Sequence, residues 1–135
     1  MIARMDATKL QGVGLFSGLS KKELEKLAQW TDQISIKEGA ELASQGRFAH
    51  EFFLIEDGLA IVTQDGKRIA ELGPGDFFGE IGLLETERRT ATVTAATPME
   101  VIVMFQREFK AMEHDMPAVA DRIRSAIRAR LDSDS

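Results

Sequence analysis

Hydrophobic and polar residues follow different periods in three consecutive parts of the chain. An opening part extends to residue 33, a middle part punctuated by glycine covers residues 34–105, and a closing part covers residues 106–131. Apolar residues in the outer parts recur every three or four positions, the period of a helix with one buried face. Those in the middle part alternate or form short runs, as strands do. The pattern predicts an all-β core with helical ends.

The opening helix is predicted to begin after Ser20. Residues 20–23 read Ser-Lys-Lys-Glu, a capping box in which the serine hydroxyl and the glutamate carboxylate each accept a backbone N–H. Leu24, Leu27 and Trp30 then mark one face of the helix. We expect that face to pack against the core.

Short strands joined by tight turns are predicted in the middle part. Period-two alternation marks residues 33–37 and 90–94. Two apolar runs, residues 51–56 and 59–63, are separated by a glycine turn. Asp65-Gly66 has the composition of a two-residue hairpin turn. This spacing is typical of a β sandwich or barrel.

Two helices are predicted at the end of the chain. Phe109 and Met112 indicate a short helix, and Pro117 suits the first position of another. Apolar residues recur every four positions along this last helix: Val119, Ile123, Ile127 and Leu131. Its arginines are interpreted as a solvated face because acidic residues lie nearby. The apolar stripe could dock on the β core, pair in a homodimer, or cover a ligand.

One loop in the middle part is not a tight turn. Residues 73–93 pass through several glycines, make about one helical turn at residues 81–84, and re-enter a strand. Backbone amides at the start of such a helix are not all bonded internally, and Gly79 and Gly82 would let an anion approach them. With Arg89 across from these amides, the loop would form a small anion site.

Charged residues near this loop narrow the kind of anion that the site could bind. A carboxylate at Glu80 would repel a polyanion but can accept hydrogen bonds from a sugar hydroxyl, which favours a singly charged sugar phosphate. Arg88 and Arg89 point to opposite faces of an extended segment, and the spacing to Glu80 favours Arg89. Arg88 is expected to be solvated or paired with Glu85 or Glu87. Taken alone, the same residues also fit a turn with a surface ion pair.

Composition excludes several classes of function. Lys and Arg total 17 against 22 Asp and Glu, a net charge of -5 that argues against a general nucleic-acid binder. The absence of cysteine excludes disulfide scaffolds, iron–sulfur clusters and thiolate zinc sites. His50 and His114 are too far apart for a helical zinc motif, so no metal site is predicted. Short apolar runs and a charged start predict a cytoplasmic chain without membrane insertion.

The loop resembles the phosphate-binding cassette of the cyclic nucleotide-binding domain family, which includes the catabolite activator protein and protein kinase A regulatory subunits. The resemblance is carried by Phe-Gly-Glu-Ile-Gly-Leu-Leu at residues 78–84 and Arg-Thr-Ala-Thr-Val at residues 89–93. It extends from residues 15–19 through residues 72–76 to the terminal helices. It implies an eight-stranded β roll of jelly-roll type, with N-terminal helices and C-terminal hinge and lid helices. One domain, residues 1–135, would hold a cassette at residues 78–93.

The resemblance also implies roles for individual residues. Arg89 would hold the cyclic phosphate, and Glu80 would bind the ribose 2′-hydroxyl. Backbone groups would complete the site, the amides of Ile81, Gly82 and Thr90 around the phosphate and Gly79 against the sugar. The hydroxyl of Thr90 can reach the purine and supports cyclic GMP binding in the family. Bacterial cyclic AMP binders carry Ser or Thr there as well, so the nucleotide stays open, with cyclic AMP favoured.

A regulatory mechanism follows from the same resemblance. Leu83 matches a relay residue that contacts the helical hinge in relatives. Ile123, Ile127, Leu131 or an arginine of the last helix would then close over the base. The expected function is that of a small sensor without catalytic activity or cofactor, which signals to an unidentified protein effector. The chain ends at residues 132–135 without a DNA-binding helix-turn-helix, which disfavours direct transcriptional control.

Three alternatives remain from the sequence. The chain could be an interaction module that keeps the fold without binding nucleotide, although Glu80 and Arg89 are both present. It could be a regulatory piece of a larger channel or kinase. A catalytic jelly roll of the metal oxygenase type would need clustered histidines in a strand, which this sequence does not contain.

Overall fold

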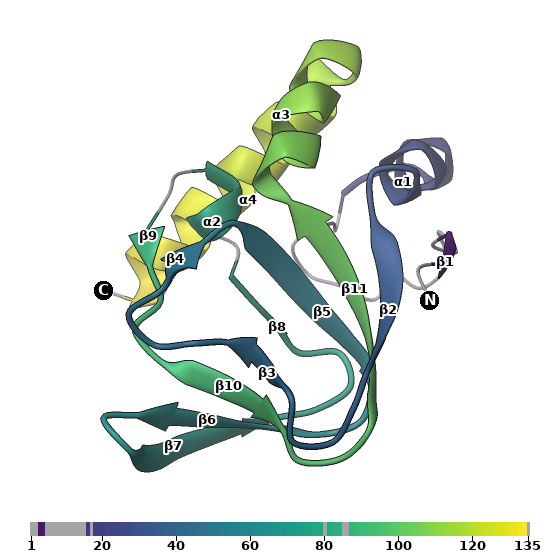
Figure 1. Cartoon of the computed structure of the whole chain (residues 1–135). Helices are drawn as coiled ribbons and strands as arrows, with labels where there is room; N and C mark the ends of the chain where they lie inside the picture. Colours follow the sequence, from purple (N-terminus) through teal and green to yellow (C-terminus); the bar gives the residue numbers. More distant parts are fainter. Residues whose placement is uncertain (1–2, 5–15, 17, 80, 85–86, 135) are drawn as a thin grey trace.

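The computed structural model describes residues 3–4, 16, 18–79, 81–84 and 87–134. Strands make up the middle of the chain and helices its ends (Figure 1). The helices are α1 (Lys21–Ala28), α2 (Ile81–Leu84), α3 (Gln106–Asp115) and α4 (Pro117–Asp134). The strands are β1 (Ala3–Arg4), β2 (Asp32–Ile36), β3 (Glu41–Ala43), β4 (Phe48–Ala49), β5 (Glu51–Asp57), β6 (Ala60–Gln64), β7 (Lys67–Leu72), β8 (Phe77–Phe78), β9 (Glu87–Arg88), β10 (Thr92–Ala95) and β11 (Met99–Phe105).

Eight strands form two antiparallel sheets. One has the order β2-β11-β5-β8, with the short β1 added beside β2, and the other has the order β3-β10-β6-β7. Buried apolar residues of both sheets form one cluster, here called the roll core. Strands β4 and β9 form a separate two-stranded ribbon. The mainly β fold class, a roll with helices at both ends, is therefore confirmed.

The central strands β5 and β11 are covered on both faces. Phe53 and Ile55 of β5 lie in the roll core, whereas the alternating Phe52 and Leu54 lie in a second cluster, here called the helical core. The helical core also contains buried residues of α1, α2, α3 and α4. A strand that is buried on both faces needs an unbroken apolar run, which explains the composition of residues 52–55.

A two-residue turn joins β6 to β7. Gln64 pairs with Lys67, so only Asp65 and Gly66 lie between the strands. Their φ angles are 53° and 80°. Positive φ at both central residues is the requirement of a type I′ hairpin turn, as the Asp-Gly sequence predicts.

The helices begin where the sequence predicts. The Ser20 N–H donates to Glu23 Oε1 at 2.9 Å, and the Glu23 N–H donates to Ser20 Oγ at 3.1 Å. Helix α1 ends at Ala28, so Trp30 lies in the turn that follows, packed against the helical core. Helix α4 begins at Pro117, whose fixed φ suits the first turn.

Ion pairs connect the terminal helices. Arg122 of α4 donates from Nη1 to Glu23 of α1 at 2.9 Å, and Arg124 Nη2 lies 2.8 Å from Glu113 Oε2 of α3. The N–H of Ser20 and the cation of Arg122 both lower the pKa of Glu23. These pairs agree with the interpretation of the α4 arginines as a solvated face. Within the described residues, no helix is long and apolar enough to cross a membrane.

Candidate functional site

Gly79 brings the backbone after β8 close to an arginine from another part of the chain. Its φ angle is +84°, in the left-handed region that favours glycine. A Cβ atom at this position would lie 2.6 Å from Arg89 Nη1 and would also collide with the carbonyl oxygen of Glu51. Only a residue without a side chain allows this approach. The structure thus brings together two of the residues singled out in the sequence, Gly79 and Arg89.

The Arg89 guanidinium is held in place by Glu51 at the start of β5. Nη2 of Arg89 donates to the Glu51 carbonyl oxygen at 2.7 Å and lies 3.6 Å from the Glu51 carboxylate. The Arg89 side chain is only 11% exposed. A largely buried guanidinium strengthens its interactions with an anion, because less water competes for its donors.

The backbone of Arg89 is paired with the loop before β4. Its N–H donates to the Arg47 carbonyl at 2.7 Å, and its carbonyl accepts the Gly46 N–H at 2.8 Å. Residues 90 and 91 then bend, so β10 begins at Thr92 and not at Thr90 as the alternation predicts. The pairing of Arg89 with this loop replaces the ladder bonds that a longer β10 would have made.

Hydrogen bonds also join this loop to the β6–β7 hairpin. Gln45 Nε2 donates to Asp65 Oδ1 at 2.8 Å, and the Asp65 N–H donates to Gln45 Oε1 at 2.9 Å. Gln64 Nε2 donates to the Thr90 carbonyl at 3.2 Å, while the Thr90 residue itself is exposed. Residues 89 and 90 are therefore held both by the loop before β4 and by the β6–β7 hairpin.

Helix α2 connects the loop to the helical core. Leu83 is buried in the cluster that contains Phe109, Ile123 and Ile127. The Gly82 N–H donates to the Gly79 carbonyl at 3.0 Å. Leu83 therefore packs in the same cluster as buried residues of α3 and α4. Glu80 and the side chain of Ile81 lie outside the described residues.

Two of the three proposed lid residues are in the core in this structure. Ile123 and Ile127 are fully buried in the helical core, and the side chain of Leu131 lies outside the described part of α4. A role in covering a ligand would require α4 to rearrange. Helix α3, which precedes α4, contains Glu108, whose carboxylate accepts the Phe105 N–H. Burial raises the pKa of Glu108, and the nearby Asp32 charge adds to that rise.

Arg88 lies on the other face of the β4–β9 ribbon. It is exposed, donates from Nη1 to the Gly46 carbonyl at 2.7 Å, and stands 4.5 Å from the centre of the Phe48 ring. The structure thus distinguishes the two neighbouring arginines as the alternation predicts, with Arg88 directed to the surface. Its hydrogen bond to a backbone carbonyl was not expected from the sequence.

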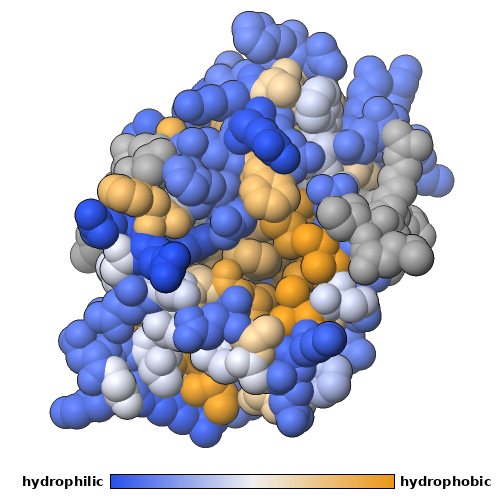
Figure 2. Space-filling model, viewed as in Figure 1, coloured by the Kyte–Doolittle hydropathy of each residue, from blue (hydrophilic) through white to orange (hydrophobic). Residues whose placement is uncertain are grey.

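Two aromatic residues lie near Gly79 and Glu51, which both contact Arg89. Phe105 of β11 is paired with Glu51, and Phe78 of β8 directly precedes Gly79. Both rings are partly exposed and pack against the roll core. Figure 2 shows apolar residues gathered in a hollow over β5 and β11. Because Phe105 pairs with Glu51, which holds Arg89, the site combines a cation with nearby apolar rings. Such a combination suits a small ligand with an anionic group and a flat apolar part.

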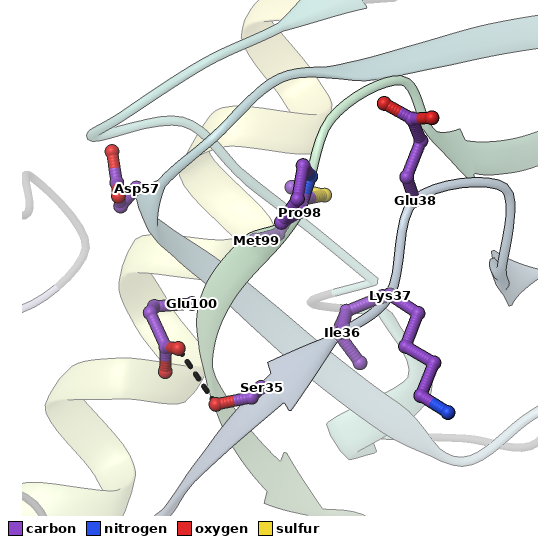
Figure 3. A pocket seen from close by; sticks show the side chains of 8 residues that line it. All are labelled: Ser35, Ile36, Lys37, Glu38, Asp57, Pro98, Met99 and Glu100. Carbon is purple, nitrogen blue, oxygen red and sulfur yellow. Dashed lines mark hydrogen bonds between the residues drawn. The ribbon is translucent and has the colours of Figure 1, made fainter.

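Another pocket lies where β2 and β11 meet β5. Its volume is about 530 Å³, and Ser35 donates to Glu100 at 2.6 Å on its wall (Figure 3). Carboxylates of Glu38, Asp57 and Glu100 line it together with Lys37. Excess negative charge disfavours an anion here, so this pocket does not compete with the Arg89 site for a phosphate. The described residues contain no group of three His, Asp or Glu side chains suited to a metal ion.

The family model of the "Cyclic nucleotide-binding domain" matches residues 33–115. The chain is 32% identical over 127 residues to a cAMP-dependent protein kinase regulatory subunit of Schizosaccharomyces pombe, which covers 93% of this chain and 30% of the relative. It is 33% identical over 114 residues to the cGMP-dependent protein kinase egl-4 of Caenorhabditis briggsae, covering 79% of this chain and 15% of the relative. The chain thus spans less than a third of either protein.

A solved structure has the same fold over almost the whole chain. It is the N-terminal domain of a transcriptional regulator from Streptomyces coelicolor, with a TM-score of 0.82 and 22% sequence identity. The match covers 97% of this chain and 96% of that structure. The roll with its flanking helices is therefore a shared arrangement.

Proposed function

This chain belongs to the cyclic nucleotide-binding domain family, and we propose that it binds a cyclic nucleotide and passes the bound state to a protein effector. The observation that carries the proposal is the approach of the Gly79 backbone to the largely buried Arg89 guanidinium. This arrangement places a positive charge beside a glycine backbone, which suits a phosphate with one negative charge. The proposed role is regulatory, in the cytoplasm, and not catalytic.

Each part of the nucleotide has a proposed partner. Arg89 binds the cyclic phosphate, and amides of Ile81, Gly82 and Thr90 complete the cradle. Gly79 lies against the sugar, and Glu80 accepts the ribose 2′-hydroxyl. The Gly82 N–H would have to share its hydrogen between the phosphate and the Gly79 carbonyl, to which it donates here. The partly exposed rings of Phe78 and Phe105 offer a surface for the flat base.

Cyclic AMP is the favoured nucleotide, and cyclic GMP is the second candidate. The two curated relatives named above are called cAMP- and cGMP-dependent, at nearly equal identity to this chain. Thr90 is exposed, and its hydroxyl could contact the base of a guanine nucleotide in the syn form. Its presence therefore keeps cyclic GMP as a candidate. The ranking is decided by a direct titration.

We expect purified protein, freed of bound nucleotide by unfolding and refolding, to bind cyclic AMP in a calorimetric titration. Cyclic GMP is expected to bind at the same site with lower affinity, and 5′-AMP, with its additional negative charge, much more weakly. Far-ultraviolet circular dichroism serves as the control for refolding. If refolded protein binds neither cyclic nucleotide, the result contradicts the proposal and favours an interaction module that has kept only the fold.

The proposed signal travels from the cassette to α4 through Leu83. Capture of the phosphate would draw α2 toward it, and Leu83 shares the helical core with Phe109, Ile123 and Ile127. The packing of α3 and α4 would then change, and one of Ile123, Ile127 and Leu131 would cover the base. An effector reads such a change only if it prefers one of the two states.

Amide hydrogen exchange tests this step. We expect cyclic nucleotide to change protection of residues 105–131 as well as that of residues 78–93. A matched measurement on Leu83→Ala protein that still binds nucleotide should show the change at residues 78–93 but a reduced change at residues 105–131. If residues 105–131 exchange identically with and without nucleotide in the unmodified protein, the lid mechanism is wrong, while binding itself stands.

A further inference from the structure

Arg47 lies directly across from Arg89. The Arg89 N–H donates to the Arg47 carbonyl at 2.7 Å, and the β4–β9 ribbon pairs Phe48 with Arg88. The Gly46 N–H donates to the Arg89 carbonyl at 2.8 Å, so Gly46 and Arg47 both oppose Arg89, as in a bulge whose first residue is a glycine with positive φ. The Arg88 guanidinium and the Phe48 ring lie together on one face of the ribbon, and side chains alternate between faces along an extended segment. Alternation from Phe48 and Arg88 therefore directs Arg47 and Arg89 to the opposite face.

The charge at the site makes a second cation useful. The Glu51 carboxylate lies 3.6 Å from Arg89 and offsets much of its positive field. Arg47 is exposed and has no ion-pair partner among the residues that the structure describes. Arg68, Arg122 and Arg124, in contrast, are each paired with a carboxylate. The proposed site also includes the Glu80 carboxylate, so Arg89, Glu51 and Glu80 together would carry a net negative charge, and Arg47 would cancel this charge, which otherwise repels a phosphate.

We propose that Arg47 is a second cationic contact for the phosphate of the bound cyclic nucleotide. The inference rests on the proposed function, because it concerns the same site. Arg89 holds the phosphate at short range from a largely buried position, and Arg47 attracts it from the rim. Because Arg47 is exposed, its contribution depends on ionic strength, whereas that of Arg89 does so much less.

The test is calorimetric titration of the full chain with cyclic AMP at ionic strengths of about 0.02 M and about 0.5 M. Arg47→Gln is expected to weaken binding about five- to tenfold at the lower ionic strength and less than twofold at the higher one. Arg47→Lys keeps the charge and should stay within about threefold of the unmodified protein. Arg88→Gln is the matched control, since it removes the same charge from the opposite face of the ribbon. It should change affinity less than twofold at either ionic strength.

The outcomes separate this inference from the proposed function. If the unmodified protein binds and Arg89→Ala does not, but Arg47→Gln binds normally at low ionic strength, the Arg47 inference is wrong and the proposed function stands. Equal weakening by Arg47→Gln and Arg88→Gln also overturns it, because only the overall charge would then matter. Weakening by Arg47→Lys as large as that by Arg47→Gln points to a structural role and overturns it too. If the unmodified protein binds neither nucleotide, both proposals fail.

Discussion

Arg89→Ala is expected to weaken cyclic AMP binding at least about 100-fold, which corresponds to about 2.7 kcal/mol. The guanidinium is the one group of the described site whose charge is both largely buried and aimed at the Gly79 backbone. Its removal would take away charge-assisted hydrogen bonds to the phosphate and leave the Glu51 carboxylate without its cation. The remaining negative charge would then repel the ligand. Isothermal titration calorimetry at neutral pH measures the change.

Two further variants make this expectation specific. Arg89→Lys retains the charge but loses the planar fork, so it should recover only part of the affinity. Arg88→Ala, at the neighbouring position on the opposite face, should bind within about twofold of the unmodified protein. Folding of each variant is checked by its thermal unfolding midpoint. Retention of tight binding by folded Arg89→Ala protein would show that the phosphate is held elsewhere.

Gly79→Ala is expected to damage both the fold and the site. The alanine would have to adopt a φ of +84°, and its Cβ would meet the Glu51 carbonyl and Arg89 Nη1. Backbone strain and the forced displacement together should lower the free energy of unfolding by about 2–4 kcal/mol. Because the displaced groups position the guanidinium, affinity for cyclic AMP should fall at least about tenfold. Urea denaturation and calorimetric titration measure the two effects.

Gly75→Ala separates the strain from the collision. Gly75 has a φ of +92°, but a Cβ there would meet no atom within 4 Å. This variant should lose about 1 kcal/mol of stability and keep its affinity for nucleotide. Equal effects of the two substitutions on binding would mean that the close approach at Gly79 has no part in ligand recognition.

Local sequence signals predicted the ends of several elements correctly. The Ser20 and Glu23 side chains cap α1, the Asp65-Gly66 turn joins β6 to β7, and Pro117 opens α4. Each of these signals works over at most four residues, so the sequence contains the whole interaction. The short helix predicted at residues 81–84 is present as α2, with the predicted bounds.

The sequence identified apolar segments without deciding what covers them. The run at residues 52–55 predicts a buried strand, but only the sheet order shows that its alternate residues enter two different cores. The stripe on α4 similarly predicts a buried face. The structure assigns Ile123 and Ile127 to the core that contains Leu83, and this choice depends on how α3 and α4 pack.

The residues that surround Arg89 could not have been found from the sequence. Glu51 is 38 positions from Arg89, and Gln45 is 20 positions from Asp65. Glutamate at the start of a strand and glutamine in a loop are common, so neither carries a signal by itself. Their role arises only when the β4–β9 ribbon and the β6–β7 hairpin bring separate segments to one place.

The sequence by itself therefore determined the division into helical ends and a β middle, several caps and turns, and the likeness of residues 78–93 to a phosphate-binding cassette. These properties depend on short-range backbone preference and on residue identity at fixed spacing. Only the tertiary structure decided that Arg89 is largely buried, that Glu51 holds its guanidinium, and that the Arg47 carbonyl accepts its N–H. Burial and side-chain direction depend on strand register, which is set by cooperative pairing between distant segments.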